Sequence, residues 1–404
     1  MRRTPSRRLF AAALLAVSVL APTAAAPATA SPAAAVPATA VDRTHPDGFP
    51  PGGLGPEVTS RLDRAVEEVR RQAGIPGVVV GLWLPGRGSY VRASGVADTA
   101  TGTPMTTGLF SRIGSETKTF TVTALLELVD EGRIGLDDPV SRYVDGVPCG
   151  DRITLRQLAE MRSGLFPYSS DPDFVRDLES DPHRSFTPRE LLAYGFRHDN
   201  TAGPGETFQY SNSNIVLLGL VIEKVSGRAL GDFLRQRVLR PARLHHTLFP
   251  RGAEFPSPHA HGYSDETPSG AIADATDWNP SWAWSAGAMI SNLADLRRWA
   301  EVVATGELLS PRTQRERLKV LPTGFPGTGY GLGIMETGGW IGHNGSLPGY
   351  ESVTVYLPSQ RATLVLLLNT DVRVQGQEPS SLLARAITEI ATPDNVYDRP
   401  VPPR

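Results

Sequence analysis

Strand-like patterns stand at both ends of this chain with a long helical stretch between them, and this order limits the fold more than any other feature. Near the start, residues 77–86 and 89–98 read as two strands joined by Gly-rich turn chemistry. Four more apolar segments follow near the end, before a helical pattern over 380–391: 329–335, 338–345, 351–358 and 362–370. We therefore expect an α+β fold. One antiparallel sheet is formed from both chain ends and flanked by helices, with an inserted all-helical lobe.

The helical stretch is read from apolar residues at helical spacing and from Gly or Pro at the ends of segments. The expected helices cover residues 56–74, 117–134, 154–161, 188–196, 214–227 and 232–239. Asp171-Pro172-Asp173 reads as a plain turn. A sheet built from the termini and a lobe built from the middle would leave a cleft between them, where active sites are common.

The first thirty residues have the form of a signal peptide. A basic start, MRRTPSRRLF, precedes an apolar run over 9–21 that is too short for a stable bilayer anchor. Ala28-Thr29-Ala30 then offers a small-residue cleavage site, and the arginine pair at 7–8 leaves the Sec and twin-arginine routes both open. We expect a signal peptide at 1–30, a flexible leader at 31–54, a catalytic domain at 55–395 and a secreted product.

Composition narrows the partners. The formal net charge is −2 and 20% of residues are charged, so we expect no nucleic-acid or membrane partner, and no span follows residue 30. Cys149 is the single cysteine, which excludes an internal disulfide and favours a bystander thiol over a nucleophile. The histidine pairs at 245–246 and 259–261 lack further ligands at metal spacing, so we expect no metal and no cofactor.

Lysine is rare here, supplying three of the 40 basic residues, and Lys118 stands one helical turn after Ser115. Three short motifs follow in order: Ser115-Glu116-Thr117-Lys118, Tyr210-Ser211-Asn212 and His343-Asn344-Gly345. Each is weak alone, because Y-x-N and H-x-G arise by chance in a chain with this many Asn and Gly residues. Their order, and the elements on which they fall, carry the interpretation.

The three motifs fit one chemistry. Ser115 at a helix start would be the nucleophile, and Lys118 would take or position its proton. Tyr210 would carry that proton to the leaving group as phenol or phenolate, while Asn212 would hold both Lys118 and the substrate amide. His343 lies on an edge-like strand whose Gly345 admits a substrate backbone. The N–H of Ser346 would complete an oxyanion hole with that of Ser115, and its hydroxyl could bind a substrate carboxylate.

Plainer interpretations exist for each residue. Ser115 could be an ordinary N-cap, Tyr210 a packed core residue, and His343 a neutral strand histidine that orients its neighbours. The tryptophans near residue 280 could form a sugar-stacking platform, although a rigid cleft wall fits better. The coincidence of three motifs favours the catalytic interpretation.

With these motifs the sequence resembles the penicillin-recognising serine hydrolases, which include class C β-lactamases, exocellular DD-carboxypeptidases and related esterases. The resemblance covers residues 56–392 and is strongest to the actinomycete exocellular D-alanyl-D-alanine carboxypeptidase, which also combines Y-S-N with a His-initiated third motif. LLELVDEGRIGLDDPVSRY, RSGL, GPGETFQYSN and SAGAMIS also match that pattern. The resemblance implies that Trp282 and Phe174 line the substrate pocket and that Asn344, Gly345 and Ser346 bind substrate.

Three positions depart from that pattern. Ile334-Met335 replaces the arginine that would hold a terminal carboxylate, Asn344 replaces a small hydroxyl residue, and Met161 replaces a histidine. We therefore expect a secreted serine hydrolase that forms an acyl-enzyme, and we expect it to be a D-Ala-D-Ala carboxypeptidase or D-amino-acid peptidase. The alternatives are an esterase or amidase, a β-lactamase, and a non-hydrolysing penicillin-binding protein. The expected partner is a small peptide, ester or β-lactam, and the expected state is a monomer.

Overall fold

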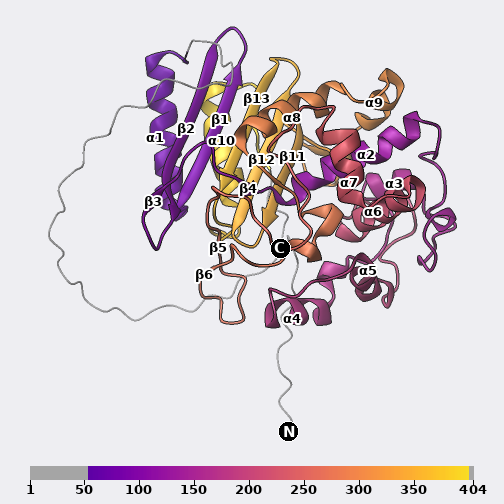
Figure 1. Cartoon of the computed structure of the whole chain (residues 1–404). Helices are drawn as coiled ribbons and strands as arrows, with labels where there is room; N and C mark the ends of the chain where they lie inside the picture. Colours follow the sequence, from indigo (N-terminus) through magenta and orange to yellow (C-terminus); the bar gives the residue numbers. More distant parts are fainter. Residues whose placement is uncertain (1–52, 400–404) are drawn as a thin grey trace.

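A computed structural model describes residues 53–399, and its largest element is a nine-stranded antiparallel sheet (Figure 1). The strand order is β3-β2-β1-β13-β12-β11-β10-β9-β8, and two short two-stranded sheets pair β4 with β7 and β5 with β6. The strands are β1 (Gly77–Leu84), β2 (Gly88–Asp98), β3 (Thr103–Pro104), β4 (Ser111–Arg112), β5 (Tyr263–Ser264), β6 (Ala273–Asp274), β7 (Ile290–Ser291), β8 (Leu321–Pro322), β9 (Thr328–Tyr330), β10 (Met335–Thr337), β11 (Trp340–Leu347), β12 (Tyr350–Leu357) and β13 (Ala362–Leu368).

Most of the α-helices lie between β4 and β8 in the sequence. The α-helices are α1 (Pro56–Gln72), α2 (Thr117–Asp130), α3 (Leu155–Ala159), α4 (Pro172–Ser180), α5 (Pro188–Phe196), α6 (Asn212–Ser226), α7 (Leu230–Leu234), α8 (Leu293–Thr305), α9 (Pro311–Arg317) and α10 (Pro379–Ala391). The short 3₁₀ helices are η1 (Gly114–Glu116), η2 (Val140–Arg142), η3 (Tyr168–Ser170), η5 (Pro280–Trp282) and η6 (Trp284–Ala286), and η4 (Arg235–Leu239) is a π-helix. No helix in the range 53–399 is long and apolar enough to cross a membrane.

The two ends of the chain meet in the middle of the sheet, as expected. β1 pairs with β13 in antiparallel register from Val78–Leu368 to Trp83–Thr363. Every residue of β1, β12 and β13 is buried, because helices cover both faces of these strands. The α+β fold with an inserted helical lobe is confirmed.

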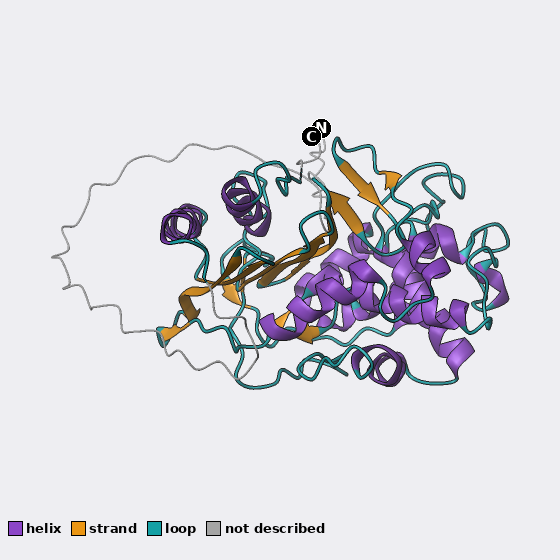
Figure 2. Ribbon diagram, turned by 90° about the horizontal axis from the view of Figure 1, so that it is seen from above, coloured by secondary structure: helices purple, strands orange, loops and turns teal. Residues whose placement is uncertain are grey.

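Two hydrophobic clusters divide the interior at the sheet. On one face, α1 and α10 lie side by side and bury Leu62 and Leu383 against alternate residues of β1 and β13 (Figure 2). On the other face, α8 and the helical lobe share the larger cluster, which extends from Val79 on the sheet into the lobe. The order of the elements therefore places the start of α2 where sheet and lobe meet.

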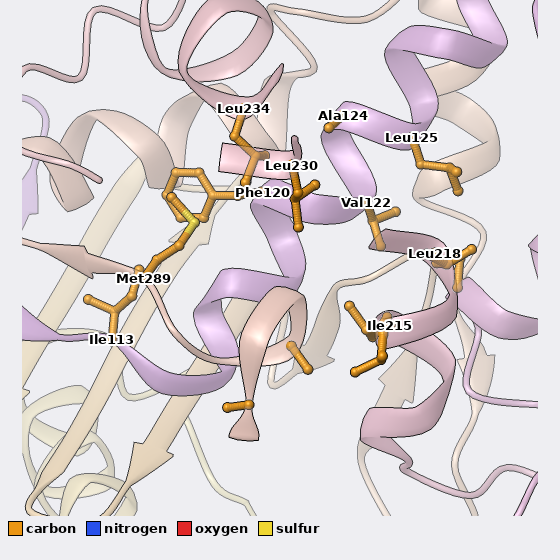
Figure 3. Close-up of a cluster of buried hydrophobic side chains, with 14 of the residues drawn as sticks. Ile113, Phe120, Val122, Ala124, Leu125, Ile215, Leu218, Leu230, Leu234 and Met289 are labelled. Atoms are coloured by element: carbon orange, nitrogen blue, oxygen red, sulfur yellow. The ribbon is translucent and has the colours of Figure 1, made fainter. Parts of the chain in front are cut away.

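The centre of the lobe is the pair α2 and α6, which are apolar on nearly every side. Helices that are hydrophobic all round belong in a core, and Figure 3 shows side chains of both helices in one cluster. Phe120 of α2 stacks on Trp299 of α8 with ring centroids 4.0 Å apart, which joins the lobe to the sheet side. This packing holds the first turn of α2 rigidly.

Some local expectations were wrong. Asp171-Pro172-Asp173 is not a plain turn, because the Asp171 carboxylate accepts the N–H groups of Asp173 and Phe174 and so caps α4. The strand expected over 329–335 is broken between Tyr330 and Met335, where Gly333 has a φ of +64°. The helix expected over 117–134 ends at Asp130. The signal peptide at 1–30, and all but the last two residues of the leader at 31–54, lie outside the described residues.

Candidate active site

Two glycines bring strand β11 into contact with the turn that carries Ser115. A Cβ on Gly345 would lie 1.9 Å from the carbonyl oxygen of Ile113, and a Cβ on Gly114 would lie 2.5 Å from the backbone nitrogen of Ser346. Gly114 also has a φ of +50°, which side chains rarely adopt. These positions accept only glycine, and they place the N–H of Ser346 next to the η1 turn.

Ser115 and Lys118 are hydrogen-bonded across one helical turn. The Nζ of Lys118 donates to the Oγ of Ser115 at 2.9 Å and to the carbonyl oxygen of Ala286 at 2.8 Å. The Lys118 side chain is fully buried, whereas Ser115 is half-buried and lines a cavity. Burial lowers the pKa of Lys118 well below its usual value, which favours the neutral amine, and a neutral amine can accept a proton.

Tyr210 reaches this pair from the segment that precedes α6. Its ring lies 4.9 Å from the Nζ of Lys118, and its side chain lines the same cavity as Ser115. Burial raises the pKa of Tyr210, and the Ser115 hydroxyl lowers it in part. Tyr210 is therefore a phenol at neutral pH. Of the two forms that the sequence left open, phenol and phenolate, the phenol is the one present.

Asn212 begins α6 and lines the cavity. The predicted hydrogen bond between Asn212 and Lys118 is not formed. Lys118 takes the carbonyl of Ala286 as its second partner, and the Oδ1 of Asn212 is buried without a hydrogen-bond partner among the described residues. A buried amide oxygen costs free energy unless a donor satisfies it. The N–H of a substrate amide would supply that donor.

His343 is buried and does not line the cavity that contains Ser115. Its Nδ1 lies 2.6 Å from the carbonyl of Asn344, so Nδ1 carries the proton and Nε2 accepts the hydroxyl of Tyr330 at 3.1 Å. Burial, followed by the charge of Lys118, lowers the pKa of His343 to about 3. His343 is thus a neutral histidine, and its geometry suits orientation of Tyr330 rather than contact with a substrate.

Tyr330 is a residue that the motif analysis missed. It is buried at the end of β9, and its ring stands edge-on to that of Tyr210 with centroids 6.2 Å apart. The only signal in the sequence was its place in the Gly-rich segment 329–333, which read as an ordinary strand. Tyr330 thus contacts both His343 and Tyr210.

The expectation of an edge-like third-motif strand is correct in part. β11 lies inside the sheet, yet β10 pairs with it only as far as Gly342, whereas β12 pairs with it to Leu347. Residues 343–347 therefore have a strand partner on one side only within the described sheet. An extended substrate could hydrogen-bond to the other side as an added strand.

A cavity with a volume of about 100 Å³ lies beside Ser115. Trp282 and Phe174 line it as expected, together with Asn344 and Ser346 from β11. The apolar residues of the lining are Phe174, Val175, Leu178, Trp282, Leu347 and Pro348. Charged residues that the sequence analysis did not single out also line it: Glu266, Asp371, Arg373, Glu378 and Arg399.

The position that lacks an arginine is part of the core. Ile334 and Met335 are buried in the larger hydrophobic cluster and do not line the cavity. Met161 is also buried, and its sulfur lies 3.6 Å from the amide nitrogen of Asn214. Within residues 53–399, no group of three or more His, Cys, Asp or Glu side chains could hold a metal ion.

Comparison with known proteins places these features in context. A sequence model of the family described as Beta-lactamase matches residues 62–387. A D-aminopeptidase from Brucella anthropi is 30% identical over 324 residues, which cover 77% of this chain and 59% of that protein. The chain thus spans about three fifths of the length of the curated relatives it matches.

Solved structures agree in fold and extend over more of their own length. A D-stereospecific amidohydrolase from Streptomyces sp. is 30% identical with a TM-score of 0.74, covering 83% of this chain and 99% of the other. D-amino acid amidase from Ochrobactrum anthropi in complex with D-phenylalanine is 27% identical with a TM-score of 0.75, covering 83% and 99%. An octameric penicillin-binding protein homologue from Pyrococcus abyssi is 26% identical with a TM-score of 0.69, covering 82% and 76%.

Proposed function

This chain belongs to the Beta-lactamase family and is a hydrolase of the β-lactamase and penicillin-binding protein fold, and from that premise we propose that it cleaves amide bonds of D-amino acids through an acyl-enzyme on Ser115. One observation carries the proposal. The buried amine of Lys118 lies 2.9 Å from the Ser115 hydroxyl, and none of its hydrogen-bond partners within residues 53–399 is a carboxylate. A neutral amine at that distance can accept the serine proton.

The acylation step uses groups that converge on Ser115. Lys118 accepts the proton as the Oγ attacks the substrate carbonyl, and the N–H groups of Ser115 and Ser346 stabilise the resulting oxyanion. Tyr210, a phenol at neutral pH, gives a proton to the departing amine and recovers one from Lys118. The free Oδ1 of Asn212 accepts the N–H of the substrate amide. Water then hydrolyses the ester by the reverse sequence of proton transfers.

The preference for D-amino acids is supported by the relatives, because the Brucella and Ochrobactrum proteins are named for D-amino-acid substrates. The apolar residues Phe174 and Trp282 of the cavity lining could contact a substrate side chain. The carboxyl-terminal specificity expected from the sequence has less support, because Met335 is buried in the core. We therefore rank the D-aminopeptidase or D-amino-acid amidase function above the D-Ala-D-Ala carboxypeptidase function.

Two acidic residues in the cavity lining could bind the amino group of a substrate. Asp371 and Glu266 line the cavity, and neither forms an ion pair within the described residues. Asp371 is buried and accepts the N–H of Gly349 and the hydroxyl of Ser264. Burial and neighbouring carboxyl groups raise the pKa of both Asp371 and Glu266. A substrate ammonium would stabilise their charged forms and oppose that rise, which favours a free α-amino group over an acylated one.

Two further features remain proposals. We expect export by the basic and apolar segment at 1–30, and this is testable by sequencing the amino terminus of the mature protein. A monomer is the other expectation, although a related protein from Pyrococcus abyssi is octameric. Light scattering of the purified chain would decide the oligomeric state.

The test uses paired enantiomers and a matched variant. Wild-type protein and Ser115→Ala are incubated with the p-nitroanilides of D-Ala, L-Ala and N-acetyl-D-Ala, and release of p-nitroaniline is followed. We expect turnover of D-Ala p-nitroanilide by wild type only, with little turnover of the other two. Turnover of the acetylated compound alone would support the carboxypeptidase alternative, whereas turnover of aryl esters or nitrocefin without any amide would overturn the proposal.

A further inference from the structure

We propose that Arg399, delivered by the carboxyl-terminal tail, is a specificity-determining residue that binds the carboxylate of an amino-acid leaving group. The inference rests on the proposed function and names the substrate class that the site prefers: D-aminoacyl dipeptides with a free carboxyl end. The observation that carries it is the position of this guanidinium, which lines the same cavity as Ser115 and Tyr210.

The tail that carries Arg399 is tightly held. The Nε1 of Trp340 donates to the carbonyl of Asn395 at 2.7 Å, and the hydroxyl of Thr337 donates to that of Asp398 at 2.7 Å. Tyr397, between them, is fully buried. Gly338, with a φ of +57°, lets the carbonyl of Val396 come within 2.1 Å of where a Cβ would stand. The tail is thus built into the β10–β11 hairpin and fixes the backbone next to Arg399.

The guanidinium is held in place by one residue, and only some of its N–H groups donate a hydrogen bond. Its Nη1 donates to the Oε2 of Glu378 at 2.6 Å, and Glu378 is its sole hydrogen-bond partner among the described residues. The same carboxylate oxygen accepts the amide of Asn344 from β11 at 3.1 Å. A guanidinium has five N–H donors, so further donors of Arg399 are available to a ligand. Its side chain is 29% exposed.

The side of the site on which Arg399 lies decides which part of the substrate it meets. Arg399 and Tyr210 line one cavity together with Ser115, so a substrate bound at Ser115 lies in a space that both side chains border. Tyr210 is the proposed proton donor to the departing amine. A departing amino acid carries its carboxylate carbon two bonds from that nitrogen, within the cavity that Arg399 also lines. Arginine binds carboxylates through paired N–H groups.

Glu378 gives the arrangement selectivity. It keeps Arg399 in place and partly neutralises it, so a neutral leaving group meets no unpaired cation. A leaving group with a carboxylate would engage the remaining N–H groups. Arg399 thus provides, from the tail, the cation that is absent at Met335.

The test compares substrates that differ by one charge. The values of kcat/KM are measured for D-Ala-D-Ala, for its carboxyl-terminal amide and for D-Ala p-nitroanilide, with wild type, Arg399→Met, Arg399→Lys and the double variant Arg399→Met/Glu378→Gln. The double variant removes the negative charge of Glu378, which Arg399→Met would leave with Arg373 as its one ion-pair partner among the described residues. Arg385→Met serves as the matched control, because Arg385 lies 3.6 Å from Asp398 of the tail and does not line the cavity.

We expect wild type to prefer the dipeptide over its amide, and Arg399→Met to lower kcat/KM for the dipeptide about 10- to 100-fold with the anilide unchanged. The double variant should show the same loss, Arg399→Lys a smaller one and Arg385→Met none. An unchanged ratio of dipeptide to amide in Arg399→Met would overturn the proposal. If wild type hydrolyses none of the compounds, the proposed function fails separately. Calorimetric binding of dipeptide and amide to Ser115→Ala, with and without Arg399→Met, then decides the role of Arg399, and equal affinities would overturn it.

Discussion

At the scale of single residues, the protonation state of Lys118 decides whether Ser115 is a nucleophile. The amine is fully buried, and its two partners are a hydroxyl and a carbonyl, neither of which carries a charge. Desolvation therefore favours the neutral form. Arginine in this position would keep its charge, since a guanidinium does not lose its proton in proteins.

We expect both Lys118→Arg and Lys118→Ala to lower kcat by about 10³-fold, because a general base contributes roughly 10²- to 10⁴-fold to such reactions. The measurement is the steady-state rate of anilide release, with circular dichroism to show that each variant is folded. Lys224→Arg, on α6 outside the cavity, is the matched control and should retain the wild-type rate. A folded Lys118→Arg protein with near-normal kcat would contradict the role of the neutral amine.

Glu116, the neighbour of Ser115, makes stability depend on pH. Its carboxyl group is 1% exposed, and burial raises its pKa from 4.5 to about 8, opposed in part by the hydroxyls of Ser352 and Thr354. Between these two pH values the unfolded chain releases a proton that the folded chain keeps. The contribution of this group to stability is therefore complete below about pH 4.5 and is lost as pH rises toward 8.

Glu116→Gln removes this titration, so its free energy of unfolding should exceed that of wild type by an amount that grows with pH. The difference should be small at pH 5 and on the order of 3 kcal/mol at pH 7.5. Urea unfolding of both proteins at the two pH values measures it. A difference that is equal at both pH values would show that Glu116 does not titrate as proposed.

Individual residues differ in how well the sequence predicts them. Ser115 and Lys118 are spaced by one helical turn, and Tyr210 belongs to a recognisable tripeptide, so local patterns in the sequence identify all three as candidates. Tyr330 and Arg399 have no such spacing. Tyr330 packs against Tyr210 and Arg399 lines the cavity, and both placements depend on long-range packing. No pattern within a few residues of either one indicates this.

At the scale of elements, the contact between β11 and η1 depends on the absence of a side chain. Gly345→Ala would place a Cβ 1.9 Å from the carbonyl of Ile113 and 2.6 Å from the Oγ of Ser352, so the strand must move away from Ser115. We expect this variant to lose at least 10²-fold in kcat, since displacement of a catalytic group by about 1 Å has that effect.

The same substitution should also lower the unfolding midpoint, which differential scanning calorimetry would record. Gly108→Ala is the control, because a Cβ there would meet nothing within 4 Å and should leave both quantities unchanged. Normal activity in Gly345→Ala would mean that β11 and η1 tolerate separation.

Elements were predicted best where periodicity and end signals coincide. The helix expected over 188–196 matches α5 in full, because Thr187 and Glu190 form a capping box and Pro188 begins the helix. The strand expected over 329–335 failed because glycines allow a chain to turn as readily as to extend. The pattern of apolar residues there is the same for a broken strand as for a continuous one.

At the scale of the whole molecule, the sheet separates two hydrophobic clusters, and the cavity lies beside only one of them. Leu62 on α1 belongs to the cluster on the face opposite the helical lobe and is fully buried. Leu62→Ala should lower the free energy of unfolding by about 2–5 kcal/mol, as cavities in packed cores do. The values of kcat and KM at 25 °C should not change, because the site is across the sheet.

Guanidinium unfolding followed by circular dichroism and by tryptophan fluorescence tests this prediction. The exposed neighbour Arg61→Ala should shift the free energy by no more than about 0.5 kcal/mol. Both probes should report one coincident transition, because β1 and β13 each contribute side chains to both hydrophobic clusters. Separate transitions for sheet and lobe would contradict a single cooperative unit.

The pairing of β1 with β13 also has a consequence in time. The chain is synthesised from its amino end, so β1 exists long before the strand that will cover its edge. All eight residues of β1 are buried in the finished protein, and until β13 arrives this apolar segment is open to aggregation or to capture by a chaperone. Ser115 and Lys118 likewise exist early without β11 and the tail. On the proposed mechanism, a growing chain therefore carries Ser115 in an inactive form, and we expect catalysis to begin only when the last strand and the tail have folded into place.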